Sequence, residues 1–160
     1  SVMVKDYGHF MQHDAVYAAK ASRIAAIAKD VSEVIADAWV QLKPSLKPIR
    51  DALPAIAYHP PCTLQHGMKL RGGVEGILRD AGFTLTPVTD SHLCCGSAGT
   101  YSVLQPEISG ELKHRKLGNL VAGKPAQIAT ANIGCMTHLQ SGTELPVKHW
   151  IELIDERLAA

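Results

Sequence analysis

Short apolar runs alternate with segments of helical periodicity through the second half of the chain, and this alternation constrains the fold more than any other feature. Four runs have the length and composition of strands: 55–58, 83–88, 127–131 and, shorter, 146–148. Helical patterns lie between and after them, over 70–81, over 106–122 and from Trp150 onward. Strands and helices in series are typical of parallel sheets with helical crossovers. The sequence therefore predicts an α/β fold with a mostly parallel sheet of about four strands.

The first part of the chain has a different pattern, with two amphipathic helices and no strand. Apolar residues recur at helical spacing over 14–29 and again over 30–43. Asp30 and Glu33 have the spacing of a capping box at the start of the second helix. That helix is expected to end before Pro44, because proline cannot continue the helical hydrogen bonding.

A linker follows the helices, because 43–50 contains two prolines and several cationic residues. We predict an N-terminal helical segment with its linker over 1–50, and a cysteine-rich domain over 51–160. The chain opens at Ser1 without an initiator methionine. We therefore expect it to be a piece of a longer protein.

The four cysteines fall at three places that only folding can bring together. Between Cys62 and Cys94 there are 31 residues, and between Gly96 and Cys135 there are 38. Cys95 is adjacent to Cys94, and each cysteine position comes shortly after a predicted strand. The carboxyl ends of parallel strands share one edge of a sheet, where ligands bind in open α/β folds. The pattern predicts one site built from three loops.

Clustered cysteines favour a metal or iron-sulfur site, and two kinds of centre remain open. Cys135 and His138 form a Cys-x-x-His pair at helical spacing, which fits a zinc site when two further cysteines complete it. The adjacent pair Cys94 and Cys95 fits a single ion less easily, since neighbouring side chains tend to point apart. An iron-sulfur cluster has several metal atoms over which adjacent thiolates can be distributed.

The residues around the paired cysteines suit a buried anionic group. Gly96 and Gly99 permit a close approach of the backbone. We expect the amides of Gly96, Ser97 and Ala98 to lie at the start of a helix, to donate to the sulfur atoms of a cluster and to favour the thiolate form of the ligands. Besides His138, three histidines lie within four residues of a cysteine and are candidate hydrogen-bond donors to the ligands: His59, His66 and His92.

Other interpretations of these residues explain less of the pattern. His92 and Cys94 have the residue types of a base and a nucleophile. The adjacent thiols of Cys94 and Cys95 are also a potential redox disulfide, although a bond between neighbours is strained. Neither interpretation uses Cys62 or Cys135. A phosphate cradle at the glycines is disfavoured, because the lysine of a Walker loop is absent.

Composition excludes several classes of partner and suggests a compartment. Lysine and arginine number 16 against 15 acidic residues, and the interspersed signs leave no basic surface for nucleic acid. The longest uncharged run, 91–105, is too short and too polar for a transmembrane segment. Four cysteines in 160 residues are far from the density of a secreted disulfide scaffold. We predict a cytoplasmic protein with reduced thiols, with association to the inner face of the membrane through a partner.

Three cysteine-bearing stretches carry a resemblance to known proteins. The order and spacing of the cysteines resemble the CCG domain of heterodisulfide reductases and their relatives. That pattern is a cysteine, about thirty residues, Cys-Cys-Gly, nearly forty residues and a last cysteine. The stretches 58–67, 91–101 and 129–139 more closely resemble the glycolate oxidase iron-sulfur subunit family. The resemblance extends from Val2 to Leu153 and so covers nearly the whole chain.

The resemblance implies an iron-sulfur cluster, of the 4Fe-4S type, held by the cysteines and by a ligand at His138, where the broader pattern has cysteine. The implied ligand set is Cys62, Cys94, Cys95, Cys135 and His138, with Gly96 in the binding loop. It also implies that this chain is the second of two CCG repeats in a longer subunit. Such a subunit would receive electrons from FAD-binding subunits that oxidise glycolate to glyoxylate, and would relay them to the quinone pool.

Two alternatives stay open beside that role. One is the equivalent subunit of a complex that oxidises lactate or another 2-hydroxy acid. The other is a zinc-bound structural module that docks the flavin subunits. In every case this chain alone is expected to carry out no bond-making chemistry.

Overall fold

The computed structural model describes residues 1–158, which divide into two compact units. The first unit is Ser1–Trp39, and the second begins at Val40. The boundary between the units therefore falls inside a helix, whereas the predicted domain boundary at residue 50 stays a prediction. No helix within residues 1–158 combines the length and the apolar character needed to cross a bilayer.

The first unit is helical, as predicted, but it contains more helices than the two expected. Its elements are α1 (Val2–Lys5), α2 (Tyr7–Phe10), α3 (Ala18–Ile27) and most of α4 (Val31–Leu42). The helix predicted from residue 14 begins only at Ala18. The Asp14 side chain accepts hydrogen bonds from the amides of Val16 and Tyr17, both at 2.8 Å, as a residue at a helix N-cap does.

The start and the end of α4 follow the sequence prediction. The Asp30 side chain accepts a hydrogen bond from the Ser32 amide at 3.0 Å, and the Glu33 carboxylate accepts one from the Asp30 amide at 2.8 Å. This is the reciprocal arrangement of a capping box. It differs in one detail, because the amide that donates to the Asp30 side chain lies two residues further along the chain rather than three. The helix ends at Leu42, and Pro44 lies in the short 3₁₀ turn η1 (Lys43–Ser45).

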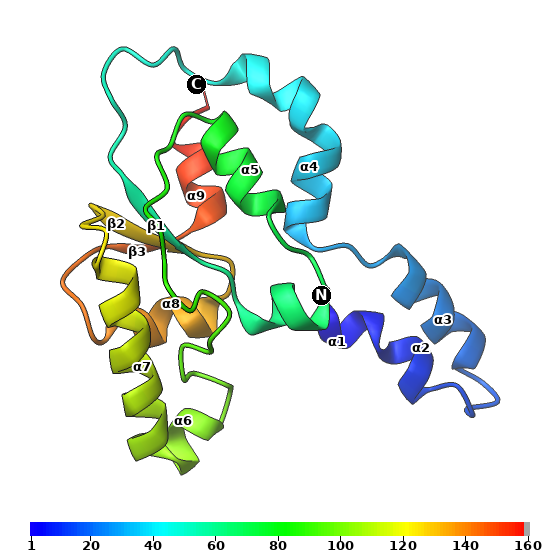
Figure 1. Cartoon of the computed structure of the whole chain (residues 1–160). Coiled ribbons are helices and arrows are strands. Elements are labelled where there is room, and N and C mark those ends of the chain that lie inside the picture. Colours follow the sequence, from blue (N-terminus) through cyan, green and yellow to red (C-terminus); the bar gives the residue numbers. More distant parts are fainter. Residues whose placement is uncertain (159–160) are drawn as a thin grey trace. The chain divides into compact units, whose positions relative to one another are not determined.

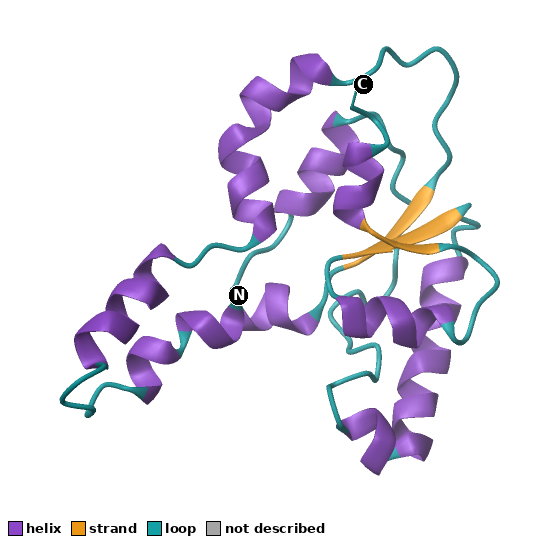
Figure 2. Ribbon diagram, turned by 180° about the vertical axis from the view of Figure 1, so that it is seen from behind, coloured by secondary structure: helices purple, strands orange, loops and turns teal. Residues whose placement is uncertain are grey.

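The second unit is built on a parallel sheet of three strands, β1 (Ile56–His59), β2 (Gln127–Thr130) and β3 (Val147–His149). The strand order is β1-β2-β3, and Figure 2 shows the three strands side by side. The ends of β1 and β2 are in register, with His59 opposite Thr130. All four residues of β1 are buried, as is typical of strands in sheets covered on both faces.

The prediction of about four strands was wrong by one, because 83–88 does not form a regular strand. Only one parallel bridge joins Leu85 to Ile56, and the Ile56 amide donates to the Thr84 carbonyl at 2.9 Å. The Thr86 amide donates in turn to the Ile56 carbonyl at 2.9 Å, and Pro87 follows directly. The segment therefore lies beside β1 without extending the sheet as a full strand.

Helices cover both faces of the sheet, α5 and α9 on one side and α7 and α8 on the other (Figure 1). The helical elements of this unit are η2 (Thr63–Gly67, a π-helical turn), α5 (Gly73–Asp80), α6 (Tyr101–Leu104), α7 (Pro106–Val121), α8 (Ile133–Gln140) and α9 (Trp150–Asp155). The alternation of strands and helices thus produces the predicted α/β arrangement.

The hydrophobic core of the second unit reaches into the cysteine loops. Its largest fully buried apolar side chains include Trp150, Ile56, Leu78, Leu120, Ile128, Leu139 and Leu153. Cys95 and Cys135 belong to the same buried cluster as Leu120, Ile128 and Leu139. Two of the four thiols are therefore packed into the core rather than displayed on the surface.

Candidate metal centre

All four cysteines line one cavity of about 400 Å³ beyond the carboxyl ends of β1 and β2. The walls come from three separate segments: the turn after β1, the Cys-Cys-Gly loop and the first turn of α8. The lining residues are Pro61, Cys62, Thr63, Cys94, Cys95, Ser97, Ala98, Gly99, Asn132, Ile133, Gly134 and Cys135. The structure thus brings together cysteines that are far apart in the sequence.

The first wall is formed where β1 ends. Pro60 and Pro61 follow the strand directly, and neither residue has an amide that could continue the sheet. The buried Gln65 side chain donates to the Pro60 carbonyl at 2.8 Å and holds this turn. Cys62 stands just before η2, at the edge of the cavity.

The second wall is the Cys-Cys-Gly loop, whose shape depends on Gly96. Its φ is +93°, and a Cβ placed there would lie 2.4 Å from the Ser109 carbonyl oxygen. The Ser109 hydroxyl donates to the Gly96 carbonyl at 2.8 Å, and the Gly96 amide donates to Cys94 Sγ at 3.3 Å. Donation from the loop amides to the sulfur atoms of a cluster stays a prediction. The expectation that this segment starts a helix was wrong, since α6 begins only at Tyr101.

The third wall is the first turn of α8, which carries Cys135. The Asn132 side chain caps this helix by accepting from the amides of Gly134 at 2.9 Å and Cys135 at 3.2 Å. A cysteine in the first turn of a helix lies at the positive end of the helix dipole, which favours the thiolate. The cap therefore fixes both the position and the electrostatic environment of Cys135.

The four thiols shift one another's pKa values. The bond from Cys62 to Cys94, with burial, raises the pKa of the Cys62 thiol and lowers that of Cys94. Bonds from Cys95 to Cys135 and to Cys94, with burial, raise the pKa of Cys95. The pKa of Cys135 is lowered by the bond from Cys95 and by the neighbouring imidazole of His59. Two sulfurs are thus stabilised as thiolates, the form that binds metals.

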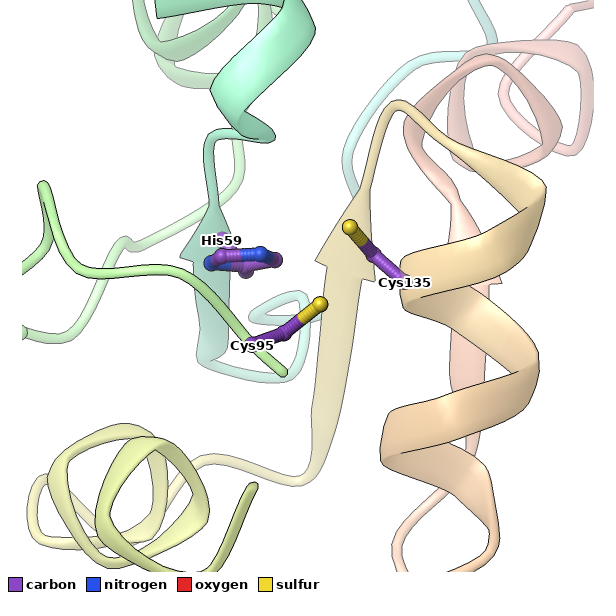
Figure 3. Close-up of side chains that lie close together, drawn as sticks. All are labelled: His59, Cys95 and Cys135. Atoms are coloured by element: carbon purple, nitrogen blue, oxygen red, sulfur yellow. The ribbon is translucent and has the colours of Figure 1, made fainter. Parts of the chain in front are cut away.

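His59 is the deepest polar residue at the site. It is fully buried at the end of β1, and neither of its ring nitrogens has a hydrogen-bond partner among the described residues. Figure 3 shows the imidazole facing the Cys95 and Cys135 side chains, and the three ligand atoms lie within 4.8 Å of one another. Nothing in the sequence distinguished His59 from the two other histidines near cysteines.

The remaining histidines lie in different environments. His138 is on α8, one turn after Cys135, as its spacing predicted, and its Nε2 lies 3.2 Å from the Ser109 hydroxyl. Its role as a ligand stays a prediction. A ring nitrogen of the exposed His66 lies 3.3 Å from the His92 carbonyl, so His66 links the turn after β1 to the loop before Cys94.

Lys116 is a residue that sequence reasoning missed. It is fully buried in α7, and its ammonium donates to the carbonyls of Asp90 at 2.8 Å and Ser91 at 3.2 Å. Burial lowers its pKa. A lysine within a helical pattern is usually exposed, so no signal in the sequence indicated that this one anchors the segment that leads to Cys94.

The donor atoms of this site fit a soft or borderline metal. Thiolate sulfur and imidazole nitrogen suit zinc and iron-sulfur centres, whereas calcium and magnesium prefer oxygen. Four thiols on one cavity, two of them stabilised as thiolates, match either of the two centres that the sequence left open. The fold and the donor set together define a cysteine-rich metal-binding α/β domain.

The family model of the CCG cysteine-rich domain matches residues 56–140, and the chain belongs to this family. The chain is also 46% identical over 155 residues to the glycolate oxidase iron-sulfur subunit of Escherichia coli strain K12. That alignment covers 97% of this chain and 37% of the relative. The resemblance inferred from the three cysteine stretches is thereby confirmed.

More distant relatives include two proteins named for lactate utilization. The chain is 28% identical over 167 residues to lactate utilization protein A of Geobacillus kaustophilus, with 98% of this chain and 66% of the relative covered. It is 26% identical over 168 residues to the protein of the same name from an Exiguobacterium species, with 97% and 64% covered. The chain thus spans about a third to two thirds of the length of these curated relatives.

Proposed function

We propose that this chain is the cluster-binding module of an iron-sulfur subunit and passes single electrons within a glycolate-oxidising complex. The observation that carries the proposal is the convergence of four thiols, from three loops, on one cavity at the end of a parallel sheet. The relation to a glycolate oxidase iron-sulfur subunit supports the same role.

Four residues would hold the cluster, Cys62, Cys94, Cys95 and Cys135, and the expected type is 4Fe-4S. Such a cluster would supply one-electron redox chemistry, with a potential set by charge, hydrogen bonds to sulfur and solvent exposure. The chain contributes the Gly96 amide as a donor to Cys94 Sγ. It also buries Cys95 and Cys135, which limits the access of water to their side of the centre.

The partners in this proposal are those that the resemblance to the glycolate oxidase iron-sulfur subunit family implies. We assign the electron donor to FAD-binding subunits that oxidise glycolate to glyoxylate, and the acceptor to the quinone pool at the inner face of the cytoplasmic membrane. The lactate utilization relatives support a variant in which lactate or another 2-hydroxy acid is oxidised upstream. In both variants this chain carries electrons and leaves the chemistry of the substrate to its partners.

A zinc-bound structural module is the second candidate, and one observation favours it. Donor atoms of His59, Cys95 and Cys135 lie within 4.8 Å of one another, a spacing suited to a single ion. Zinc has no redox chemistry, so this candidate would position the flavin subunits without carrying electrons.

Replacing both adjacent cysteines tests the electron-transfer proposal. The Cys94→Ser, Cys95→Ser variant and the parent chain would be reconstituted with iron and sulfide without oxygen, and their iron and acid-labile sulfide measured. We expect the variant to lose the cluster, since half of the thiols are removed. Ser97→Ala is the matched control, because Ser97 lines the same cavity and offers no thiol. Full iron and sulfide in the double variant would reject the proposed ligand set.

A further inference from the structure

His59 has a combination of properties that the four thiols do not explain. It is fully buried, and both ring nitrogens lack a hydrogen-bond partner among the described residues. Buried polar atoms in native proteins are nearly always partnered, so an unpartnered imidazole indicates a partner that is not part of the polypeptide. The side chains next to it are thiols of metal-ligand type.

The spacing around His59 fits direct coordination. Its ring nitrogen and the Sγ atoms of Cys95 and Cys135 lie within 4.8 Å of one another. Nitrogen and sulfur ligands bind a tetrahedral metal at about 2.0–2.3 Å, which places two ligand atoms roughly 3.5–3.8 Å apart. Small side-chain adjustments, of about 1 Å, therefore bring all three atoms within bonding distance of one metal centre. Figure 3 shows all three side chains converging on the same point.

The second histidine near the thiols has a different environment. The Nε2 of His138 lies 3.2 Å from the Ser109 hydroxyl and also close to Gly96. The ring nitrogens of His59, in contrast, have no hydrogen-bond partner among the described residues.

We propose that His59 binds the metal centre directly through a ring nitrogen, together with the thiolates of Cys95 and Cys135. This inference rests on the proposed function and names the nitrogen ligand of the same site. Imidazole is a neutral ligand, so a centre in which it takes the place of one thiolate carries less negative charge than an all-thiolate centre. In Rieske centres two histidines replace two cysteines and raise the reduction potential, so the same kind of exchange would shift this centre toward easier reduction.

Pulsed electron paramagnetic resonance on the reduced, reconstituted chain tests the ligand directly. We expect a directly bound nitrogen in the parent chain whose signal changes when histidine is labelled with ¹⁵N. The signal should vanish in His59→Gln and persist in His138→Gln, the matched control. Retention of the nitrogen signal in His59→Gln, or its absence from the parent chain, would overturn the inference.

A second variant covers the case in which His59→Gln does not fold. The triple variant His66→Gln, His92→Gln, His138→Gln removes the other histidines near the cysteines and leaves His59 in place. A ¹⁵N-histidine signal that persists in the triple variant supports His59 as the ligand. Its loss assigns the nitrogen to one of the three replaced residues.

Zinc loading separates failure of this inference from failure of the proposed function. If the parent chain forms no cluster, the proposed function fails, and X-ray absorption of the zinc-loaded chain still tests His59. We then expect a nitrogen ligand at about 2.0–2.1 Å beside sulfur at about 2.3 Å, lost in His59→Gln and kept in His138→Gln. An all-sulfur shell in the parent chain would reject His59 as a ligand.

Discussion

The end of β1 and the first turns of α8 each place a histidine three residues from a cysteine, yet the two histidines differ in environment. His59 precedes Cys62 and is fully buried without a partner, whereas His138 follows Cys135, is half-buried and lies against the Ser109 hydroxyl. Sequence spacing favours His138 as a ligand, because i and i+3 share a helix face. Burial and missing partners favour His59.

The difference comes from what holds each segment. His59 is the last residue of a strand that pairs with β2 and, through Ile56, with the 83–88 segment. Strand pairing fixes the direction of the imidazole before any metal binds. On α8, the helix fixes only which side chains share a face, and Ser109 of α7 offers His138 a partner within the protein. A shared face therefore does not by itself make a ligand.

The largest effect is expected at Gly96, which lies between the two regions. Gly96→Ala would force a side chain to adopt a φ of +93° and to meet the Ser109 carbonyl at 2.4 Å. We expect the free energy of unfolding of the metal-free chain to fall by about 3 kcal/mol, from backbone strain plus overpacking. Urea denaturation followed by circular dichroism measures it.

Gly99→Ala is the matched control in the same loop. Gly99 also has a positive φ, of +61°, but no atom lies within 4 Å of its Cβ position. The expected loss is about 1 kcal/mol, from strain alone. Equal losses at the two glycines would show that the contact between the Cys-Cys-Gly loop and α7 does not constrain the site.

An intermediate effect of opposite sign is expected at His59. Replacing a buried polar group that has no partner with an apolar one removes a desolvation penalty. The metal-free His59→Leu variant should therefore be as stable as the parent, or up to about 2 kcal/mol more stable, while it loses metal affinity. His138→Leu should lose about 1 kcal/mol instead, since the contact with Ser109 is removed. A clear loss of stability in His59→Leu would show that the imidazole of His59, like that of His138, has a stabilising partner within the protein.

The smallest effect is expected at the cap of α8. Asn132→Ala removes the acceptor of the Gly134 and Cys135 amides and should cost about 1 kcal/mol. Asn132→Asp retains an acceptor at the same position and should preserve stability, which makes it the control. A thermal unfolding series on the three proteins measures the effect. If alanine and aspartate behaved alike, the cap would not be what positions Cys135.

Much of the fold could be predicted because its signals are local. The buried run 55–58 predicted β1 within one residue at either end, and Pro106 predicted the start of α7. The convergence of the cysteines followed from the parallel topology, since strand ends share an edge. The late start of α3 at Ala18 and the pairing of 83–88 through a single bridge were not predicted.

The rest of the site could not be predicted because the burial of a side chain depends on the whole fold. His59, His66 and His92 are equivalent by spacing alone, but only His59 is buried, at the end of a strand that pairs with β2. Lys116 has the pattern of a solvated helix residue and is buried only because α7 packs against the segment before Cys94. The burial of His59 and Lys116 is therefore not visible in the hydrophobic periodicity of the sequence.

The central claim is that the four cysteines hold a redox-active iron-sulfur centre. The most direct test is the iron, acid-labile sulfide and zinc content of the 160-residue chain reconstituted without oxygen, with its visible absorption before and after dithionite. We expect iron with a matching amount of acid-labile sulfide, and a visible absorption that dithionite bleaches. Stoichiometric zinc without colour, under conditions that supply iron and sulfide, would contradict it and make the cysteine site a structural clamp.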